Sequence, residues 1–296
     1  MDESAPEIRD REVVLNGSRV HYLTAGDGPP LVLLHGLGDS ARDWQWVMPA
    51  LARRSRVVAP DFPGFGDSDR PRAAYSPGFF AEFVAGFLEA LHIPSAVVAG
   101  NSLGGLAALR FALVDPARVP ALVLVDGAGL GRRVNPGMRV LSLPGLGEPA
   151  TAFARTRPGR ALRLWGRTRS LFAHHRRAPA GWIADQDRLS RRPDFPRNTL
   201  EVLRAVVGPS GQREVLRERL PELPMPTLIV WGERDRVIPL AHGRDAVGRL
   251  RRGRLAVIPD CGHVPQIERP DLFLEALGSF LDGAIAGAGS DGSHAE

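Results

Sequence analysis

Short apolar runs alternate with segments of helical periodicity along most of the chain. The candidate strands are 12–15, 19–24, 31–34, 57–59, 96–99, 121–125, 227–231 and 255–258, and the candidate helices are 44–53, 77–91, 103–114, 240–250 and 272–281. The middle strands are continuous runs of Val, Leu, Ile and Ala, which are typical of parallel strands buried on both faces. The alternation therefore predicts an α/β fold with a mostly parallel eight-stranded sheet covered by helices on both faces.

The alternation stops between about residues 129 and 223, where Arg, Pro and Gly are abundant and no strand is evident. Spaced apolar residues in this stretch indicate short amphipathic helices; they are Trp165, Leu171, Phe172, Trp182, Ile183, Leu200, Leu203 and Val206. We predict a helical cap at 131–222, inserted between core segments 1–130 and 223–282. The small, polar tail 283–296 is expected to be disordered.

The composition is that of an ordinary globular protein, with 44% hydrophobic and 24% charged residues in 296. No apolar stretch is long enough to cross a bilayer, and the charged start, MDESAPEIRDREVV, lacks the apolar core of a signal peptide. The single cysteine, Cys261, excludes an internal disulfide and fits a reducing compartment. We therefore expect a cytoplasmic protein without a membrane partner.

The strongest chemical motif is VVAGNSLGG, an apolar strand that runs directly into a Gly-x-Ser-x-Gly turn followed by a helix. This is the arrangement of a nucleophile elbow, in which Ser102 projects from a tight turn between Gly100-Asn101 and Leu103-Gly104. The glycines are needed because strand and helix leave no room for side chains. Ser102 is the candidate nucleophile, and the N–H of Leu103 would face a developing oxyanion.

Three further strands end in loops with suitable chemistry. The run LVLLHGLG can supply a second oxyanion donor, the N–H of Leu37, while the His35 side chain is expected to brace that loop. The loop after 227–231 carries Asp235, and the loop after 255–258 carries His263. Open α/β sheets build their sites at the carboxyl ends of strands, so these loops should meet.

The chain order Ser, Asp, His predicts a division of labour among three side chains. His263 would take the proton of Ser102 and later deliver it to the leaving group. Asp235 would orient the imidazole and stabilise its charged form. Asp126, at the end of strand 121–125, is an alternative acid, but Asp235 has the commoner position, and Asp126 fits a loop-capping or cap-hinge role.

Together with the loop DFPGFGDS, these motifs resemble the α/β-hydrolase superfamily over residues 10–282, with the insertion similar to its variable helical cap. Ser68 also lies in a Gly-x-Gly-x-Ser string, but no helix follows, so it is interpreted as a loop residue. Haloalkane dehalogenases and most epoxide hydrolases carry Asp at the elbow, so Ser102 argues against both branches.

Within the serine branch, GNSLGG resembles meta-cleavage-product hydrolases, which split carbon–carbon bonds. Those enzymes usually have Trp after the catalytic histidine, where this chain has Val264, and Gly-Pro-Gly in the oxyanion loop, where this chain has Gly38-Asp39-Ser40. Carboxylesterases and lactonases share the remaining features. The resemblance therefore implies hydrolysis of an ester or lactone of a small or medium substrate through an acyl-enzyme.

Other activities stay open. They are carbon–carbon hydrolysis and, on the same scaffold, a lyase, a cofactor-free oxygenase or a cyclase. A non-catalytic binding protein would typically lack a triad member, and none is missing here. We expect a small-molecule substrate, no cofactor and no metal, and the oligomeric state is not readable from the sequence.

Charge adds one hypothesis about the substrate. The chain carries a net charge of +5 and all 38 of its Lys and Arg residues are arginine, yet no zinc-ligand spacing, RNA-recognition motif or dense basic run indicates a nucleic-acid partner. Residues 131–220 hold 19 Arg against 7 acids, a local net of +12. Either these arginines form a solvated surface, or the cap favours substrates with an anionic group.

Overall fold

The computed structural model describes residues 6–290 and contains an eight-stranded sheet of order β1-β2-β4-β3-β5-β6-β9-β10. The strands are β1 (Arg9–Leu15), β2 (Ser18–Ala25), β3 (Pro30–Leu34), β4 (Arg56–Pro60), β5 (Val97–Asn101), β6 (Leu122–Val125), β9 (Thr227–Gly232) and β10 (Gly253–Ile258). Strand β2 runs antiparallel to β1 and β4, and every other pairing is parallel. The predicted fold class is confirmed.

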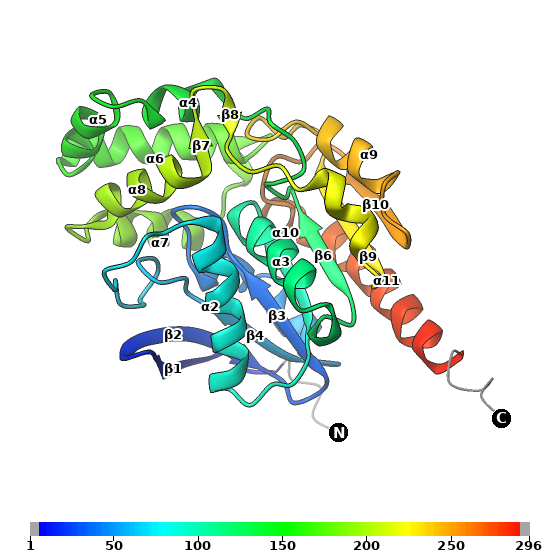
Figure 1. Ribbon diagram of the computed structural model, residues 1–296. Coiled ribbons are helices and arrows are strands. Elements are labelled where there is room, and N and C mark those ends of the chain that lie inside the picture. Colours follow the sequence, from blue (N-terminus) through cyan, green and yellow to red (C-terminus); the bar gives the residue numbers. More distant parts are fainter. Residues whose placement is uncertain (1–5, 291–296) are drawn as a thin grey trace.

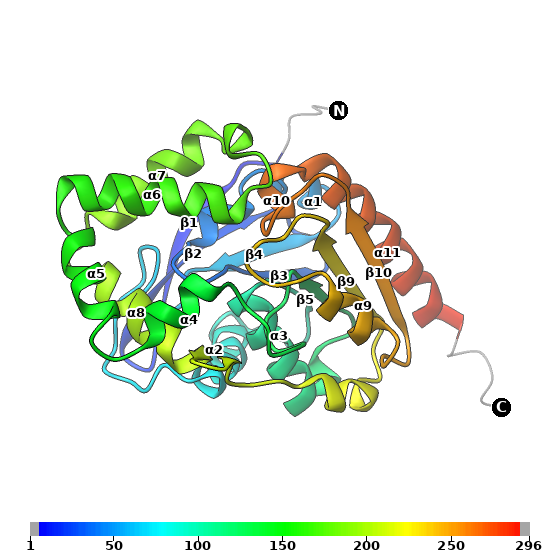
Figure 2. The ribbon, with the colours of Figure 1, turned by 90° about the horizontal axis from the view of Figure 1, so that it is seen from above.

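Helices cover both faces of the sheet. They are α1 (Met48–Leu51), α2 (Pro77–Ala90), α3 (Leu103–Val114), α9 (Ala241–Val247), α10 (Pro265–Glu268) and α11 (Pro270–Ser290). Viewed from above, α2, α3 and α9 lie on one side of the sheet and α1 and α11 on the other (Figure 2). Each face of the sheet packs against its own hydrophobic core. Alternate residues of β3 belong to different cores: Val32 and Leu34 pack on the first side, and Leu31 and Leu33 on the second.

Two predicted helices differ from the observed ones. The segment predicted as one helix, 44–53, is a 3₁₀ turn, η1 (Ala41–Trp44), followed by the four-residue α1 with Pro49 at its start. Proline is favoured in a first helical turn and excluded from the interior, so the chain restarts there. At the other end of the chain, α11 continues to Ser290, whereas the sequence suggested a disordered tail from 283. The alanines at 284, 286 and 288 favour helix, and the glycines at 283, 287 and 289 oppose it. Residues 291–296 of that prediction lie outside the described residues.

The segment 131–222 contains five helices: α4 (Pro136–Ser142), α5 (Gly147–Ala154), α6 (Arg157–Leu171), α7 (Ala180–Ser190) and α8 (Phe195–Val206). They gather at one end of the sheet, at the upper left of the ribbon (Figure 1). A two-residue strand pair, β7 (Val207–Gly208) and β8 (Gly211–Gln212), also lies here, although the sequence showed no strand. Short 3₁₀ turns complete the chain: η2 (Pro116–Arg118), η3 (His175–Arg177) and η4 (Arg217–Glu222). None of the helices in the described part combines the length and hydropathy that a bilayer crossing requires.

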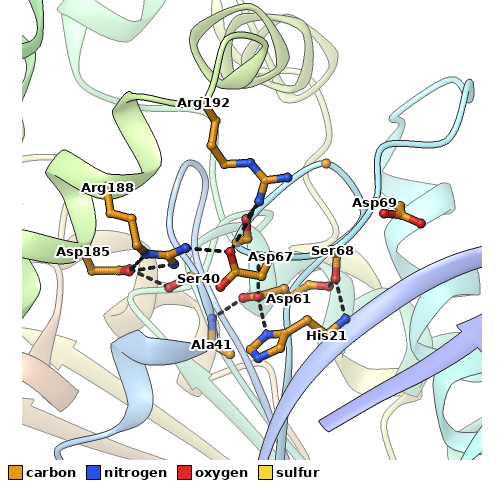
Figure 3. Close-up of polar contacts among 12 residues, drawn as sticks. His21, Ser40, Ala41, Asp61, Asp67, Ser68, Asp69, Asp185, Arg188 and Arg192 are labelled. Atoms are coloured by element: carbon orange, nitrogen blue, oxygen red, sulfur yellow. Dashed lines mark hydrogen bonds and ion pairs between the residues drawn. The ribbon is translucent and has the colours of Figure 1, made fainter. Parts of the chain in front are cut away.

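The loop after β4 is organised around the buried carboxylate of Asp61 (Figure 3). Its Oδ1 accepts the N–H of Ala41 at 2.6 Å, and its Oδ2 accepts the N–H of Asp67 at 2.8 Å and lies 2.7 Å from His21 Nδ1. Ser68 Oγ donates to the Asp61 carbonyl and accepts the His21 N–H, which agrees with its predicted role as a loop residue.

The same loop holds the cap helices in place. Arg188 of α7 pairs with Asp67 at 2.6 Å and with Asp185 at 2.9 Å, and Asp185 accepts from Ser40 Oγ at 2.8 Å. Figure 3 shows these side chains converging from the cap and the core, with Arg192 reaching the loop from above. Asp185 is almost fully buried, whereas the side chains of Arg188 and Arg192 are partly exposed. We therefore expect the Ser40–Asp185 hydrogen bond to hold the cap on the core more firmly than the arginine pairs do.

We expect the interaction of His21 with Asp61 to make stability depend on pH. Burial lowers the pKa of His21, but the hydrogen bond to Asp61 and its charge outweigh that effect, and the pKa is raised above its ordinary value. A raised folded-state pKa adds stability that is fully present below about pH 6.5, the unfolded pKa, and is lost as pH rises through the folded pKa.

His21→Gln should therefore destabilise the protein more at pH 6 than at pH 9, measured as urea midpoints across that range. His175→Gln, at an exposed histidine on η3, is the matched control and should show no such trend. An equal loss at both pH values would contradict the assignment.

Candidate active site

Ser102 sits at the junction of β5 and α3 with φ +55° and ψ −111°, a backbone conformation that non-glycine residues rarely adopt. Its N–H donates to Val125 O at 3.0 Å, which ties the turn to β6. A Cβ atom at Gly100 would collide with the carbonyl of Gly104, and one at Gly104 would collide with the carbonyl of Leu34. The two glycines are therefore required by backbone contact, as the motif predicts.

His263 lies in the loop after β10 and its Nδ1 is 2.8 Å from Asp235 Oδ2. Both side chains are almost completely buried. The remaining oxygen of Asp235 accepts the N–H groups of Val237 at 2.7 Å and Ile238 at 3.1 Å. A hydrogen bond from Nδ1 to the Asp235 carboxylate leaves Nε2 as the nitrogen that can accept a proton. His263 and Ser102 line the same cavity.

Asp126, the alternative acid, lies close to Asp235 and His263 but forms no hydrogen bond with the histidine. It follows β6 at φ +46°, and its Oδ1 accepts the Gly232 N–H at 2.9 Å. Its Oδ2 has no hydrogen-bond partner among the described residues. Burial, then the charge of Asp235, raise the pKa of Asp126 well above its usual range. The raised pKa favours the neutral form of Asp126.

Within residues 6–290, two clusters have donor atoms close enough to hold a metal ion: His21 with Asp61 and Asp67, and His263 with Asp126 and Asp235. In each cluster a histidine nitrogen already forms a short contact with an aspartate oxygen, at 2.7 Å and 2.8 Å respectively. The hydrogen bond accounts for the histidine and one aspartate of each cluster, whereas Asp126 Oδ2 of the second cluster has no hydrogen-bond partner among the described residues.

The loop after β3 passes beside the elbow. His35 is buried, its Nδ1 contacts Gly36 O at 2.7 Å, and its Nε2 accepts the Phe62 N–H at 2.9 Å. Burial lowers the pKa of His35, in keeping with a neutral ring that braces the loop. A Cβ placed on Gly36 would lie 3.5 Å from Ser102 Cβ. Neither Leu37 nor Leu103 donates its N–H to another described residue, and Leu37 lines the cavity beside Ser102.

Several positioning contacts were not predicted from the sequence. Asn101 donates to Val125 O and, at 3.0 Å, to His263 O, so the elbow holds the histidine loop directly. Glu268 accepts the N–H groups of Gly262, Ala173 and His174 at 2.7–2.9 Å. These partners are as far as 162 residues apart in the chain, and no local pattern marks them.

The cavity has a volume of about 550 Å³ and lies between the core loops and the cap. Its floor contains Gly36, Ser102 and His263. Its roof comes from α4, α5, α6 and α8, which contribute mainly apolar side chains: Met138, Leu141, Phe153, Ala154, Leu162, Leu171, Leu200 and Leu203. Such a pocket suits a small or medium apolar ligand with few polar groups.

Residues 29–270 match the family described as the alpha/beta hydrolase fold. The chain belongs to this family. The resemblance predicted from the motifs is confirmed, and the coarse assignment is a hydrolase of the α/β-hydrolase fold.

The chain is similar to relatives with different named substrates. It is 33% identical to a 2-hydroxymuconate semialdehyde hydrolase of a Pseudomonas species over 97% of this chain and 98% of that one. Its structure resembles a bacterial membrane phospholipase A (TM-score 0.77, 30% identity, 94% and 86% covered). It also resembles an enol-lactonase of Burkholderia xenovorans (TM-score 0.77, 25% identity, 92% and 100% covered). Membership of the family therefore establishes the fold. The substrate has to be inferred from the cavity, because the named substrates of these relatives differ.

The collision at Gly104 gives a stability prediction. Gly104→Ala places a methyl group against the Leu34 carbonyl and should lower the free energy of unfolding by about 1–3 kcal/mol or more. Gly278→Ala, in α11 with nothing within 4 Å of the added carbon, should raise it by about 0.5–1 kcal/mol. Chemical denaturation of both variants checks this, and equal stability would refute the packing argument.

Proposed function

We propose that the protein is a serine hydrolase that cleaves an ester or lactone of a small or medium substrate through an acyl-enzyme. The observation that carries the proposal is the hydrogen bond between His263 and Asp235, on a cavity that also contains Ser102 at a strained elbow. The proposal includes a small-molecule substrate, no bound cofactor and a cytoplasmic location.

The geometry supports a two-step reaction. His263 Nε2 takes the proton of Ser102 Oγ while Oγ bonds to the substrate carbonyl carbon. The N–H groups of Leu37 and Leu103 receive the negative charge that develops on the carbonyl oxygen. The carbon–oxygen bond to the leaving group then breaks, and His263 gives it the proton. Water attacks the acyl-enzyme with the same base and releases the acid and Ser102.

Asp235 stabilises the imidazolium that forms between the two proton transfers. Its three hydrogen bonds hold the carboxylate in one orientation. This support costs no rearrangement during the reaction, because the hydrogen bonds exist before the substrate binds.

Carbon–carbon hydrolysis is the second candidate, favoured by the near full-length similarity to a 2-hydroxymuconate semialdehyde hydrolase. The chain departs from that pattern next to the histidine, where Val264 is 1% exposed and does not line the cavity. A non-hydrolytic reaction on the same scaffold is the third. A fluorophosphonate probe, a panel of p-nitrophenyl esters and a vinylogous diketone assayed in parallel distinguish the three.

Ser102→Ala should lower ester turnover by roughly 10⁴-fold or more, because the covalent route is lost. The fluorophosphonate label should disappear as well, while circular dichroism and the melting temperature stay close to those of the parent protein. A folded Ser102→Ala protein with near-normal turnover would instead indicate a non-hydrolytic enzyme.

The two acids should differ in their effect on kcat. Asp235→Asn removes the acceptor that sets the His263 tautomer and should cost roughly 10⁴-fold. Asp126→Asn replaces a protonated carboxyl by a neutral group of the same shape, and we expect a change of less than about tenfold. Both variants are measured on one ester under saturating conditions. A reversed ranking would make Asp126 the functional acid.

A further inference from the structure

One face of α6 borders the cavity. The residues concerned recur at helical spacing and are Gly159, Leu162, Arg163, Gly166, Arg167, Ser170 and Leu171. Among the described arginines of the cap, Arg163 and Arg167 line this cavity and the others do not. Two of the 19 arginines of residues 131–220 thus border the cavity that contains Ser102.

The two guanidinium groups differ in their partners. Arg167 forms an ion pair with Asp39 and donates to the carbonyl of Leu37 at 3.3 Å. Asp39 also accepts from Gln186 at 3.0 Å, so its carboxylate is already engaged. No side-chain N–H of Arg163 donates to a described residue, and its Nη1 and Nη2 are buried. The ring of Phe195 lies against it, 4.8 Å from the guanidinium carbon.

A buried cation without an acceptor is expensive, because it loses its hydration and gains no hydrogen bond in return. Burial, together with the charge of Arg167, lowers the pKa of Arg163 to about 9. Phe195 offsets part of this cost through its π face but provides no oxygen. An anion that accepts hydrogen bonds from the Arg163 guanidinium would remove the rest of this cost.

We propose that Arg163 is a subsite for a carboxylate of the substrate, at the end remote from the bond that is cleaved. A carboxylate can take two parallel hydrogen bonds from one guanidinium, which fixes its orientation as well as its position. The inference rests on the proposed function, since Ser102 must act on the carbonyl of the same molecule. The substrate class is then an ester or lactone whose acyl part carries a carboxylate.

The position of Arg163 separates this subsite from general attraction by a basic surface. A surface field weakens with added salt, whereas a buried pair is screened much less. The preference for an anionic substrate should therefore persist from about 0.05 M to 0.5 M salt. A preference that vanishes over this range would assign it to the outer arginines and overturn the subsite.

The test compares p-nitrophenyl hexanoate with the mono-p-nitrophenyl ester of adipic acid, which differs by a terminal carboxylate. The parent protein should show a higher kcat/KM for the adipate ester. Arg163→Met should lower that ratio by about 10–100-fold, the range for hydrogen bonds to a charged group. Arg169→Met is the matched control, because Arg169 lies on α6 over Trp165 and does not line the cavity.

Binding of adipate to the Ser102→Ala protein, measured by calorimetry, separates failure of the subsite from failure of the proposed function. Adipate binding that is lost on adding Arg163→Met supports the subsite even where neither ester is hydrolysed. Adipate binding that is unchanged by Arg163→Met, or absent, overturns it. Should Arg163→Met fail to fold, Arg163→Lys, which retains the charge but not the paired donors, should lower the ratio by a smaller factor; an unchanged ratio overturns the subsite.

Discussion

The close approach of α3 to the neighbouring backbone is the constraint on which the site depends. Gly104 lies against the carbonyl of Leu34 at the end of β3, and Gly100 lies against the first turn of α3. Nothing larger than hydrogen fits at either contact, so the chain must turn at Ser102 within one residue. The price is a strained backbone at φ +55°, which the surrounding sheet and helix hold in place. The strain puts the hydroxyl group at the cavity and the N–H of Leu103 at the start of a helix, where a negative charge is favoured.

Buried hydrogen bonds connect this turn to the other loops of the site and hold them in place. The side chain of Asn101 holds the carbonyl of His263, and the N–H of His263 donates to Leu171 at the end of α6. Glu268 then ties the histidine loop to the residues that follow α6. The cap is thus bonded to the loop that carries the proposed base, and a shift of α6 would be felt at His263. Because the partners are buried, each lost hydrogen bond would leave an unsatisfied group, so the arrangement resists partial opening.

The strand–helix alternation sufficed to predict the sheet, because a strand buried on both faces needs an unbroken apolar run and little else. The elbow could be predicted for a similar reason, since its glycines, serine and flanking elements are contiguous in the chain. The contacts that could not be predicted join residues that are far apart in the chain. The contacts of Asp39 with Arg167 and Gln186 span 128 and 147 residues. Nor could the sequence show that Asp126, the alternative acid, accepts a hydrogen bond from Gly232 and forms none with the histidine.

The net charge of the cap says less about ligand binding than the positions of the individual arginines do. Of the 19 arginines in 131–220, nine form ion pairs with described carboxylates, and those pairs are mostly at the surface. Pairs of this kind contribute little to stability and are screened by salt. Arg163 differs because its Nη atoms are shielded from water and donate to no described residue, so its free energy is sensitive to what enters the cavity. In a pocket with mainly apolar walls, one such group has more influence on which ligand is accepted than the remaining positive charge of the cap.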